Sequence, residues 1–242
     1  MSKLPKAPLI EVVFELRWTI LTKEELNQCQ YLHGDFYSKI KNQYNFREAL
    51  ITPEVPLEIC IGRPTHRFRQ SQDGYPLVQV GPGILTLNTV DSKYFWDEFE
   101  LLILDAIKKF NEVFIFPHEK QITLSLQYFD FIKFDFAQDN IFEYLEENLN
   151  INVGQKIYQK KDKPVNLNLG MHFDTEEGAL SVVLSKGLNN VKENGIIIQT
   201  SLLSTTLLPN IESIKDWISK SHDVCSQVFK DMTKGKLYES FK

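Results

Sequence analysis

The stretch that most constrains this chain is residues 8–18, where apolar and polar side chains alternate. One row of side chains is apolar and consists of Ile10, Val12, Phe14, Leu16 and Trp18. The intervening positions include Glu11, Glu15, Arg17 and Thr19. A period of two is typical of a strand with one buried face, because successive side chains point to opposite faces. The stretch therefore predicts the founding strand of an antiparallel sheet with one face in water.

The composition indicates a folded protein and argues against several classes of function. Of the 242 residues, 43% are apolar and 24% are charged, which suits a protein with a large core. Twenty-seven Lys and Arg against 32 Asp and Glu give a net charge of −5, which opposes attraction to nucleic-acid phosphates. Cys29, Cys60 and Cys225 are odd in number and widely spaced, which favours neither a disulfide framework nor a zinc site. A nucleic-acid partner is therefore disfavoured.

The sequence also argues against a membrane location. No window approaches the roughly 20 consecutive apolar residues of a membrane span. Residues 1–8 contain too short an apolar run for a signal peptide. We therefore expect a protein of the cytoplasm.

The first half of the chain predicts one strand, one helix, three strands and a second helix. Thr22 and Glu25 have the spacing of a capping box, and a helix is expected from there to about Tyr44, with a break near Gly34. Strands are expected at 57–62, 66–72 and 76–90, the last with a bend at Gly81-Pro82-Gly83. Apolar residues at three- and four-residue spacing predict a long helix over 93–114.

The second half predicts the same order of elements. We expect a strand at 122–136, a helix at 140–148, strands at 165–174, 178–186 and 195–204, and a helix from 211 to about 241. The chain therefore divides into two βαβββα units, at residues 1–118 and 119–242. The predicted class is α+β, with antiparallel sheets and long helices packed on one face, as in helix-grip or TATA-binding-like duplications. One compact body is favoured over two separate domains, because no Gly- or Ser-rich linker separates the halves.

Four stretches carry a family resemblance. The motif Pro-Leu-Ile-Glu-Val-Val-Phe-Glu-Leu-Arg-Trp at 8–18 resembles the opening of a sporadically distributed family of uncharacterised bacterial proteins. Residues 79–99, 126–130 and 222–233 also resemble that family, so the likeness spans nearly the whole chain. Gln127 departs from it, since the family is expected to have Arg there, which argues against an anion contact. The scattered occurrence of the family implies a gene of an accessory cassette, such as a defence or toxin–antitoxin cassette.

The face of the sheet turned away from the helices is the candidate binding surface. It is predicted to be mixed, rich in amides and hydroxyls, which suits a protein partner or a polar ligand better than DNA. Its candidate binding residues are Glu11, Glu15, Arg17, Gln79, Gln127, Phe129 and His172. A solvated face without a partner is the alternative interpretation.

Asp130 and His222 are candidates for a buried polar pair. His222 falls on the core-facing stripe of the last helix, and Asp130 interrupts the apolar phase of the strand at 122–136. A buried carboxylate requires a partner, and a contact with His222 would satisfy both groups. The same contact could orient a catalytic imidazole, but no nucleophile is evident nearby, so a structural role is favoured.

Other chemistry-bearing groups give weaker signals. His172 and Asp174 share one face of a strand but supply only two metal ligands, so no metal site is predicted. Basic clusters at 63–69 and 156–163 contain aromatic residues, as in grips for single strands, but they also fit protected sheet edges. The sequence lacks the common nucleotide-binding, hydrolase and zincin motifs, and no cofactor is implied.

Three functions remain open at this point. The first is a non-enzymatic interaction or regulatory protein that binds a protein partner through the sheet face. The second is a small-ligand-binding or hydrolytic enzyme that uses Asp130, His172 or His222 in a cleft between sheet and helices. The third is a nucleic-acid binder that uses the basic loops.

Overall fold

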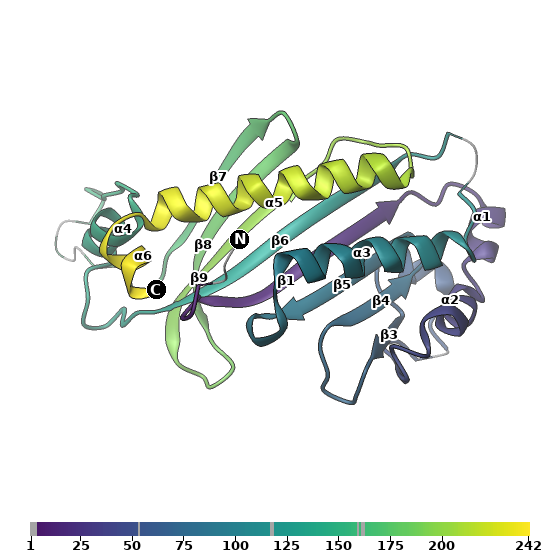
Figure 1. Cartoon of the computed structure of the whole chain (residues 1–242). Coiled ribbons are helices and arrows are strands. Elements are labelled where there is room, and N and C mark those ends of the chain that lie inside the picture. The colour runs from purple at the N-terminus through teal and green to yellow at the C-terminus, as the bar shows by residue number, and fades with distance from the viewer. Residues whose placement is uncertain (1–3, 53, 117–118, 159, 161–162) are drawn as a thin grey trace. The chain divides into compact units, whose positions relative to one another are not determined.

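The protein is an α+β structure with one antiparallel, open sheet of nine strands and six α-helices in the described part of the chain (Figure 1). The fold is seen in a computed structural model. The structure describes residues 4–52, 54–116, 119–158, 160 and 163–242. The hydrogen-bonded strand order is β2-β3-β4-β5-β1-β6-β9-β8-β7.

The elements have the following bounds. The strands are β1 (Leu9–Trp18), β2 (Phe46–Ala49), β3 (His66–Arg69), β4 (Leu77–Gly81), β5 (Ile84–Val90), β6 (Ile122–Lys133), β7 (Asn168–Thr175), β8 (Gly178–Leu188) and β9 (Asn194–Leu203). The α-helices are α1 (Lys23–Gln28), α2 (Leu32–Ile40), α3 (Trp96–Asn111), α4 (Ile141–Leu149), α5 (Ile211–Thr233) and α6 (Lys236–Ser240). Two short 3-10 helices are η1 (Leu57–Cys60) and η2 (Asp91–Lys93).

The chain forms two compact units that are not contiguous in sequence. Unit 1 comprises residues 1–10, 127–202 and 221–242, and unit 2 comprises residues 11–126 and 203–220. The predicted division into residues 1–118 and 119–242 stays a prediction. Its boundary adjoins residues 117–118, which lie outside the described residues.

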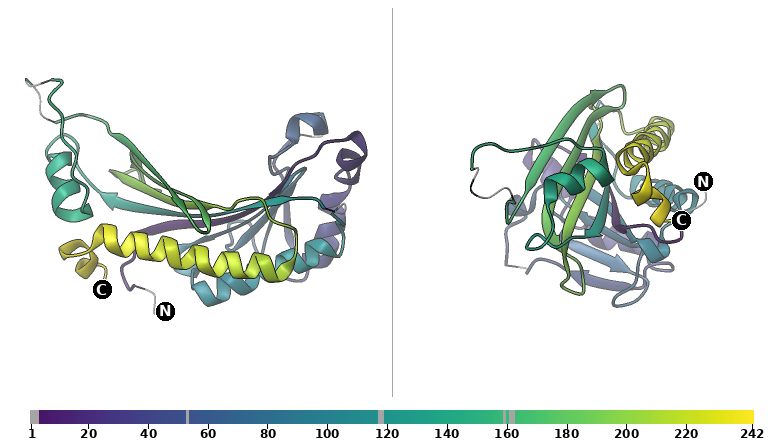
Figure 2. Two further views of the ribbon diagram at one scale, coloured as in Figure 1. Left: turned by 90° about the horizontal axis from the view of Figure 1, so that it is seen from above. Right: turned by 90° about the vertical axis from the view of Figure 1, so that its left-hand side faces the viewer.

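Unit 2 is built on β1, which pairs with β5 in the register Phe14 to Leu87. The strands β2, β3, β4, β5 and β1 follow one another across this part of the sheet. Helix α3 lies along one of its faces (Figures 1 and 2). Trp18 and Phe110 form its aromatic core together with Phe114, with ring centroids 5.1–5.4 Å apart.

The register of unit 2 separates two kinds of cross-strand row. One kind faces α3 and is apolar, for example the row Leu16, Leu85 and Val80, in which every residue is 0% exposed. The other kind faces away from α3. Successive side chains of a strand point to opposite faces, so along the strands every apolar row facing α3 is followed by a row facing away from it.

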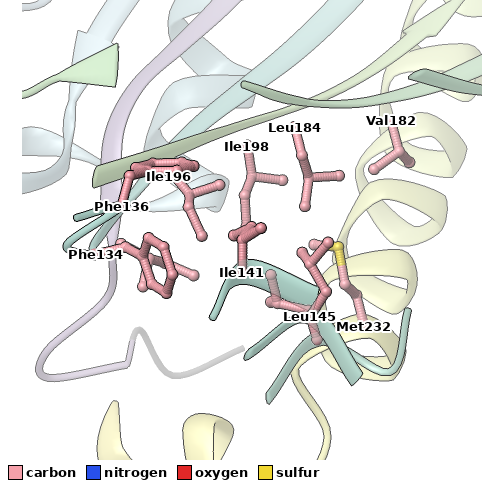
Figure 3. Packing of buried hydrophobic residues seen from close by; sticks show 11 residues of the cluster. Phe134, Phe136, Ile141, Leu145, Val182, Leu184, Ile196, Ile198 and Met232 are labelled. Carbon is pink, nitrogen blue, oxygen red and sulfur yellow. The ribbon is translucent and has the colours of Figure 1, made fainter. Parts of the chain in front are cut away.

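Unit 1 contains β7, β8, β9 and most of β6, with α4, α6 and the C-terminal part of α5. That part of α5 runs along one face of the strands (Figure 2). Figure 3 shows its core, in which side chains of α4 such as Leu145 meet strand residues such as Ile198 and Leu184, all 0% exposed. Met232 at the end of α5 closes this cluster.

The expected elements of the second half agree closely with those observed. The predicted strands at 165–174, 178–186 and 195–204 correspond to β7, β8 and β9. The predicted C-terminal helix is α5 followed by α6, and Gly235 with φ of 118° separates them. The period-two and three-to-four-residue patterns identified these elements because each has one buried face.

The predicted strand at 57–62 is wrong, because residues 57–60 form η1. Its apolar alternation does not mark a buried face, since Ile59 and Ile61 are 63% and 42% exposed and Cys60 between them is 2% exposed. The backbone N–H of Ile59 donates to Pro56 O at 3.1 Å, so a local hydrogen bond replaces a sheet ladder here. The missing strand is β2, which the sequence did not reveal because all four of its side chains are exposed.

The predicted single strand at 76–90 is a hairpin of β4 and β5. Pro82 and Gly83 form its two-residue turn, and Gly83 has φ of 81°. Pro sets the first turn dihedral and Gly accepts the positive φ of the second, so this pair favours a reversal over a bend. A Cβ at Gly83 would also lie 2.9 Å from Trp18 O, which ties the turn to β1.

The predicted helix from Thr22 to about Tyr44 is two helices, α1 and α2. The capping box is confirmed, since Thr22 Oγ1 accepts from Glu25 N at 3.2 Å and Glu25 Oε2 accepts from Leu21 N at 2.7 Å. The break lies at residues 29–31 and not near Gly34, which is inside α2. Cys29 N donates to Leu26 O at 3.0 Å, a tightened turn that ends α1.

Removal of the Phe110 ring should strongly destabilise unit 2. Phe110 is 0% exposed and contacts the rings of Trp18, Phe36 and Phe114, so Phe110→Ala leaves a cavity that these rings cannot fill. We expect a loss of about 3–5 kcal/mol in the free energy of unfolding, measured by urea denaturation. Leu101→Ala on the same helix is the control, because Leu101 is 67% exposed and should change stability by less than about 0.5 kcal/mol. Equal effects of the two substitutions would contradict this packing.

Candidate functional site

A row of polar side chains crosses the five strands of unit 2 on the face turned away from α3. Direct register neighbours form it, from Glu48 on β2 to Arg67, from Arg67 to Gln79, from Gln79 to Thr86, and from Thr86 to Glu15 on β1. We call these five residues the polar row. Antiparallel pairing alone brings them together, because directly opposed side chains stand about 4.5–5.5 Å apart at Cβ.

Hydrogen bonds connect the first four members of the polar row. Arg67 Nη1 lies 3.4 Å from Glu48 Oε2, and Arg67 Nε donates to Gln79 Oε1 at 3.1 Å. Gln79 Nε2 donates in turn to Thr86 Oγ1 at 3.1 Å. The Gln79 amide is therefore held with its oxygen toward Arg67 and its nitrogen toward β5.

Asn88 extends the polar row to the start of β1. Its Oδ1 accepts from Thr86 Oγ1 at 3.2 Å, and its Nδ2 donates to Glu11 Oε1 at 2.8 Å. Thr86 is only 2% exposed, so its hydroxyl depends on these neighbours for hydrogen bonds. The result is a connected chain of polar groups, with the orientation of each member set by the next.

Arg17 is fixed at the β1 end of the polar row. Its Nε pairs with Glu15 Oε2 at 2.8 Å, and its Nη1 donates to Gly62 O at 3.0 Å. The Arg17 side chain is still 41% exposed. Because guanidinium carries five donors in one plane, Arg17 retains donors for a bound group.

The segment that follows β2 exposes apolar side chains, and its end contacts Arg17. Gly62 lies just beyond η1 and accepts the Arg17 hydrogen bond, so the end of this segment is fixed beside the polar row. Ile59 and Ile61 are 63% and 42% exposed and Val55 is 37% exposed. A polar network beside exposed apolar side chains is the composition of protein interfaces.

The remaining predicted binding residues lie in unit 1. Gln127 on β6 accepts through Oε1 from Gln199 Nε2 on β9 at 3.0 Å. Phe129 on β6 is half-buried, and His172 on β7 is exposed. A role in binding for Gln127, Phe129 and His172 stays a prediction, as it does for Glu11, Glu15, Arg17 and Gln79.

Asp130 and His222 are both buried in unit 1, 5% and 9% exposed. His222 Nδ1 lies 2.8 Å from Tyr128 Oη, two residues before Asp130 on the same face of β6. Which of the two atoms donates depends on the tautomer of the imidazole. A pairing of Asp130 with His222 stays a prediction, and Tyr128 is the partner that the sequence did not reveal.

Two histidines stack on the face of unit 2 that packs against α2. The rings of His33 on α2 and His66 on β3 have centroids 3.8 Å apart and an interplanar angle of 4°. Burial, the adjacent His33 ring and the Arg47 guanidinium lower the pKa of His66 to about 4. Burial and Arg47 also lower the pKa of His33, while Asp35 opposes this effect. The pair is therefore neutral near pH 7.

The basic cluster at 63–69 makes contacts within unit 2. Arg67 belongs to the polar row, and Arg69 Nη1 donates to Gly74 O at 3.0 Å with its guanidinium over the Tyr75 ring. In the cluster at 156–163, residues 159, 161 and 162 lie outside the described residues. Arg67 thus has partners on the neighbouring strands, and Arg69 has partners in the loop between β3 and β4.

Metal ligands, membrane helices and disulfides can be assessed over most of the chain. Within the described ranges, no group of three or more His, Cys, Asp or Glu side chains is placed to hold a metal ion. No helix in those ranges combines the length and apolar character that crossing a membrane requires. All three cysteines are free and buried, and burial raises the pKa of Cys225 to about 12 and that of Cys29 to about 11.

Comparisons of the chain with protein-family models, with curated proteins and with solved structures find no match. The site is therefore described from its own residues alone.

Several members of the polar network were not among the predicted site residues. Glu48 lies on the strand that the sequence did not reveal, and Arg67 was grouped with a basic cluster. Thr86 and Asn88 were placed in a strand that continued across the turn at Pro82. Pro82-Gly83 is a turn signal in the sequence, and a chain reversal there in place of a bend would have placed Gln79 opposite Thr86.

Acid should destabilise unit 2 through the stacked histidines. Since the folded-state pKa of His66 is below that of an unfolded imidazole, the unfolded state binds more protons between about pH 6.5 and pH 4. Stability should therefore fall as the pH decreases through this window. Urea denaturation at pH 7 and pH 5 should show a smaller loss for His66→Phe, which keeps a stacked ring but cannot be protonated. Equal losses of stability in the wild type and in His66→Phe would contradict the assignment of this acid effect to protonation of His66.

Proposed function

We propose that the protein is a non-enzymatic interaction or regulatory protein that binds a protein partner through the polar face of unit 2. The observation that carries this proposal is the run of hydrogen bonds from Glu48 through Arg67, Gln79, Thr86 and Asn88 to Glu11. The Glu15–Arg17 ion pair lies next to it, because Glu15 is opposite Thr86 in the register. Side chains on an ordinary solvated sheet face are mobile, and ordering them opposes binding by about 0.5–1.5 kcal/mol each. In the polar row this ordering is already present before a partner arrives.

The chemistry of the row supports a protein partner over a nucleic acid. Arg67 and Arg17 pair with Glu48 and Glu15, so the face carries both signs of charge and no excess of cations. Affinity for a phosphate backbone depends on unneutralised cations, and the net charge of −5 opposes it further. Amides and paired charges instead provide donors and acceptors with defined directions, which suit a polar protein surface.

The family resemblance extends this proposal to a biological setting. We infer a cytoplasmic component of a bacterial accessory cassette, with a partner encoded nearby, on the strength of that resemblance alone. The proposal also includes the duplication of βαβββα units in a helix-grip or TATA-binding-like arrangement. The agreement of the predicted and observed elements in residues 122–240 supports the second of these units.

An enzyme is the second candidate, and one observation favours it. The imidazole of His222 is hydrogen-bonded to Tyr128 and buried on the same side of β6 as Asp130. A histidine oriented in this way can act as a general base where a substrate reaches it. The experiment below therefore includes a variant at His222.

Partner capture should depend on Arg17. We expect the tagged wild-type protein to retain a stoichiometric protein from its host, identified by mass spectrometry and then purified for titration. Arg17→Ala should weaken this complex at least about tenfold, because loss of an arginine that anchors an interface costs more than about 1 kcal/mol.

Lys133→Ala and His222→Gln are the controls for this experiment. Lys133 is 74% exposed and pairs with Glu193 in unit 1, so its loss removes the same charge from another surface. Both controls should bind as the wild type does. Equal weakening of the complex by Arg17→Ala and Lys133→Ala would reject the polar row as the binding surface. If His222→Gln alone loses the biological activity of the protein while it still binds the partner, the enzyme is favoured.

A further inference from the structure

The two edge strands of the described sheet differ in the features that normally prevent edge-to-edge association. β2 has four residues, and two of them, Arg47 and Glu48, are charged. β7 has eight residues and pairs with β8 without interruption from Asn168↔Ser185 to Thr175↔Gly178. It contains no Lys, Arg or Pro, and its single charge is Asp174. Natural edge strands are usually short, charged, bulged or interrupted by Pro, so β7 lacks the usual protection.

The register shows which backbone groups of β7 point away from β8. Lys186 N donates to Leu167 O at 3.2 Å, and antiparallel pairs alternate between bonded and non-bonded positions. Odd-numbered residues from 167 to 175 therefore direct their backbone groups toward β8. The even-numbered residues Asn168, Gly170, His172 and Asp174 direct their N–H and C=O groups toward the outer edge.

The side chains of β7 also separate into two faces. Leu169 and Met171 are partly buried against the core of unit 1 shown in Figure 3, and they face the same side as Leu184 and Val182. Phe173 continues this apolar face but is 51% exposed. The core therefore extends to the outer edge of β7 and ends there with an uncovered aromatic ring.

A second copy of β7 complements the first when the two run antiparallel about a twofold axis at Met171. Residues whose backbone N–H and C=O groups point to the outer edge then lie opposite residues of the same kind in the second copy, as an antiparallel ladder requires. Asn168 lies opposite Asp174 of the second copy, where an amide can donate to a carboxylate. Gly170, which has no Cβ, lies opposite His172 of the second copy.

The apolar face matches in the same register. Leu169 lies opposite Phe173 of the second copy, and the two Met171 side chains meet on the axis. Each of the two Phe173 rings in the dimer is then covered by Leu169 of the other copy. The register centred on His172 instead sets imidazole opposite imidazole and Gly170 opposite Asp174, and it leaves Phe173 opposite Met171.

We infer that two copies of this chain associate through β7, antiparallel and in register about Met171, so that the ladder of unit 1 continues into the second copy. Such isologous contacts are the commonest basis of homodimers. Because one edge strand buries a small area, the dimer should be weak and should form as the protein concentration rises. This inference is independent of the polar row, which lies in unit 2.

Sedimentation and crosslinking test both the association and its register. The wild-type mass should rise with concentration from 28.2 kDa toward twice that value. In Met171→Cys the two new thiols belong to a non-bonded pair with Cα atoms about 4.5 Å apart, which a disulfide can span. This variant should form a covalent dimer on mild oxidation.

Phe173→Cys is the matched control for crosslinking. It introduces a thiol on the same face of the same strand, but the two thiols would be about 13 Å apart, too far for a disulfide. The native Cys29, Cys60 and Cys225 are buried and serve as an internal background in both variants. A wild type that stays monomeric, or equal crosslinking by the two variants, would overturn the inference.

A charge exchange tests the same register without cysteine chemistry. Asn168→Asp places a carboxylate opposite Asp174 twice in the dimer and should weaken association roughly tenfold. The double variant Asn168→Asp with Asp174→Asn restores one amide opposite one carboxylate and should recover the wild-type affinity. Both positions are exposed, so the fold of the monomer should not change, which circular dichroism can verify. Failure of the double variant to recover would overturn the proposed register.

Discussion

The alternation of β1 between two faces is the constraint on which unit 2 depends. Phe14 and Leu16 are 0% exposed on the side of α3, while Glu15 and Arg17 form an ion pair on the other side. A slip of one residue against β5 would bury Glu15 among aromatic rings and expose Phe14. The apolar core therefore sets the register, and the register then determines which polar side chains face one another.

The polar row follows from this register and not from closeness in sequence. Glu11 and Asn88 are 77 positions apart and form a hydrogen bond of 2.8 Å. Gln79 bonds to Arg67 on one side and to Thr86 on the other, and these two bonds set the orientation of its amide. Side chains held in this way lose little freedom on binding, which favours selective recognition of a polar surface.

The two edge strands of the sheet differ in their chemistry. The exposed, charged β2 ends the sheet on one side and carries Glu48, the first member of the polar row. The long and nearly uncharged β7 leaves the apolar face of unit 1 incomplete at Phe173. Two surfaces in separate units thus have different chemistry, one suited to a polar partner and the other to the ladder of an identical strand.

The sequence by itself determined the elements with one continuous buried face, namely β1, α3 and most elements after residue 122. Their periodicity is a local property, because it records which side chains of one element meet the core. The tertiary structure alone decided that residues 57–60 form η1, that β2 exists, and that Tyr128 meets His222. An exposed four-residue strand has no periodicity to detect, and a buried polar group is paired by residues far away in sequence. For the same reason, the sequence indicated a polar face with Glu15, Arg17 and Gln79. Only strand pairing showed that Gln79 bonds to Arg67 and Thr86, and that Glu15 lies opposite Thr86.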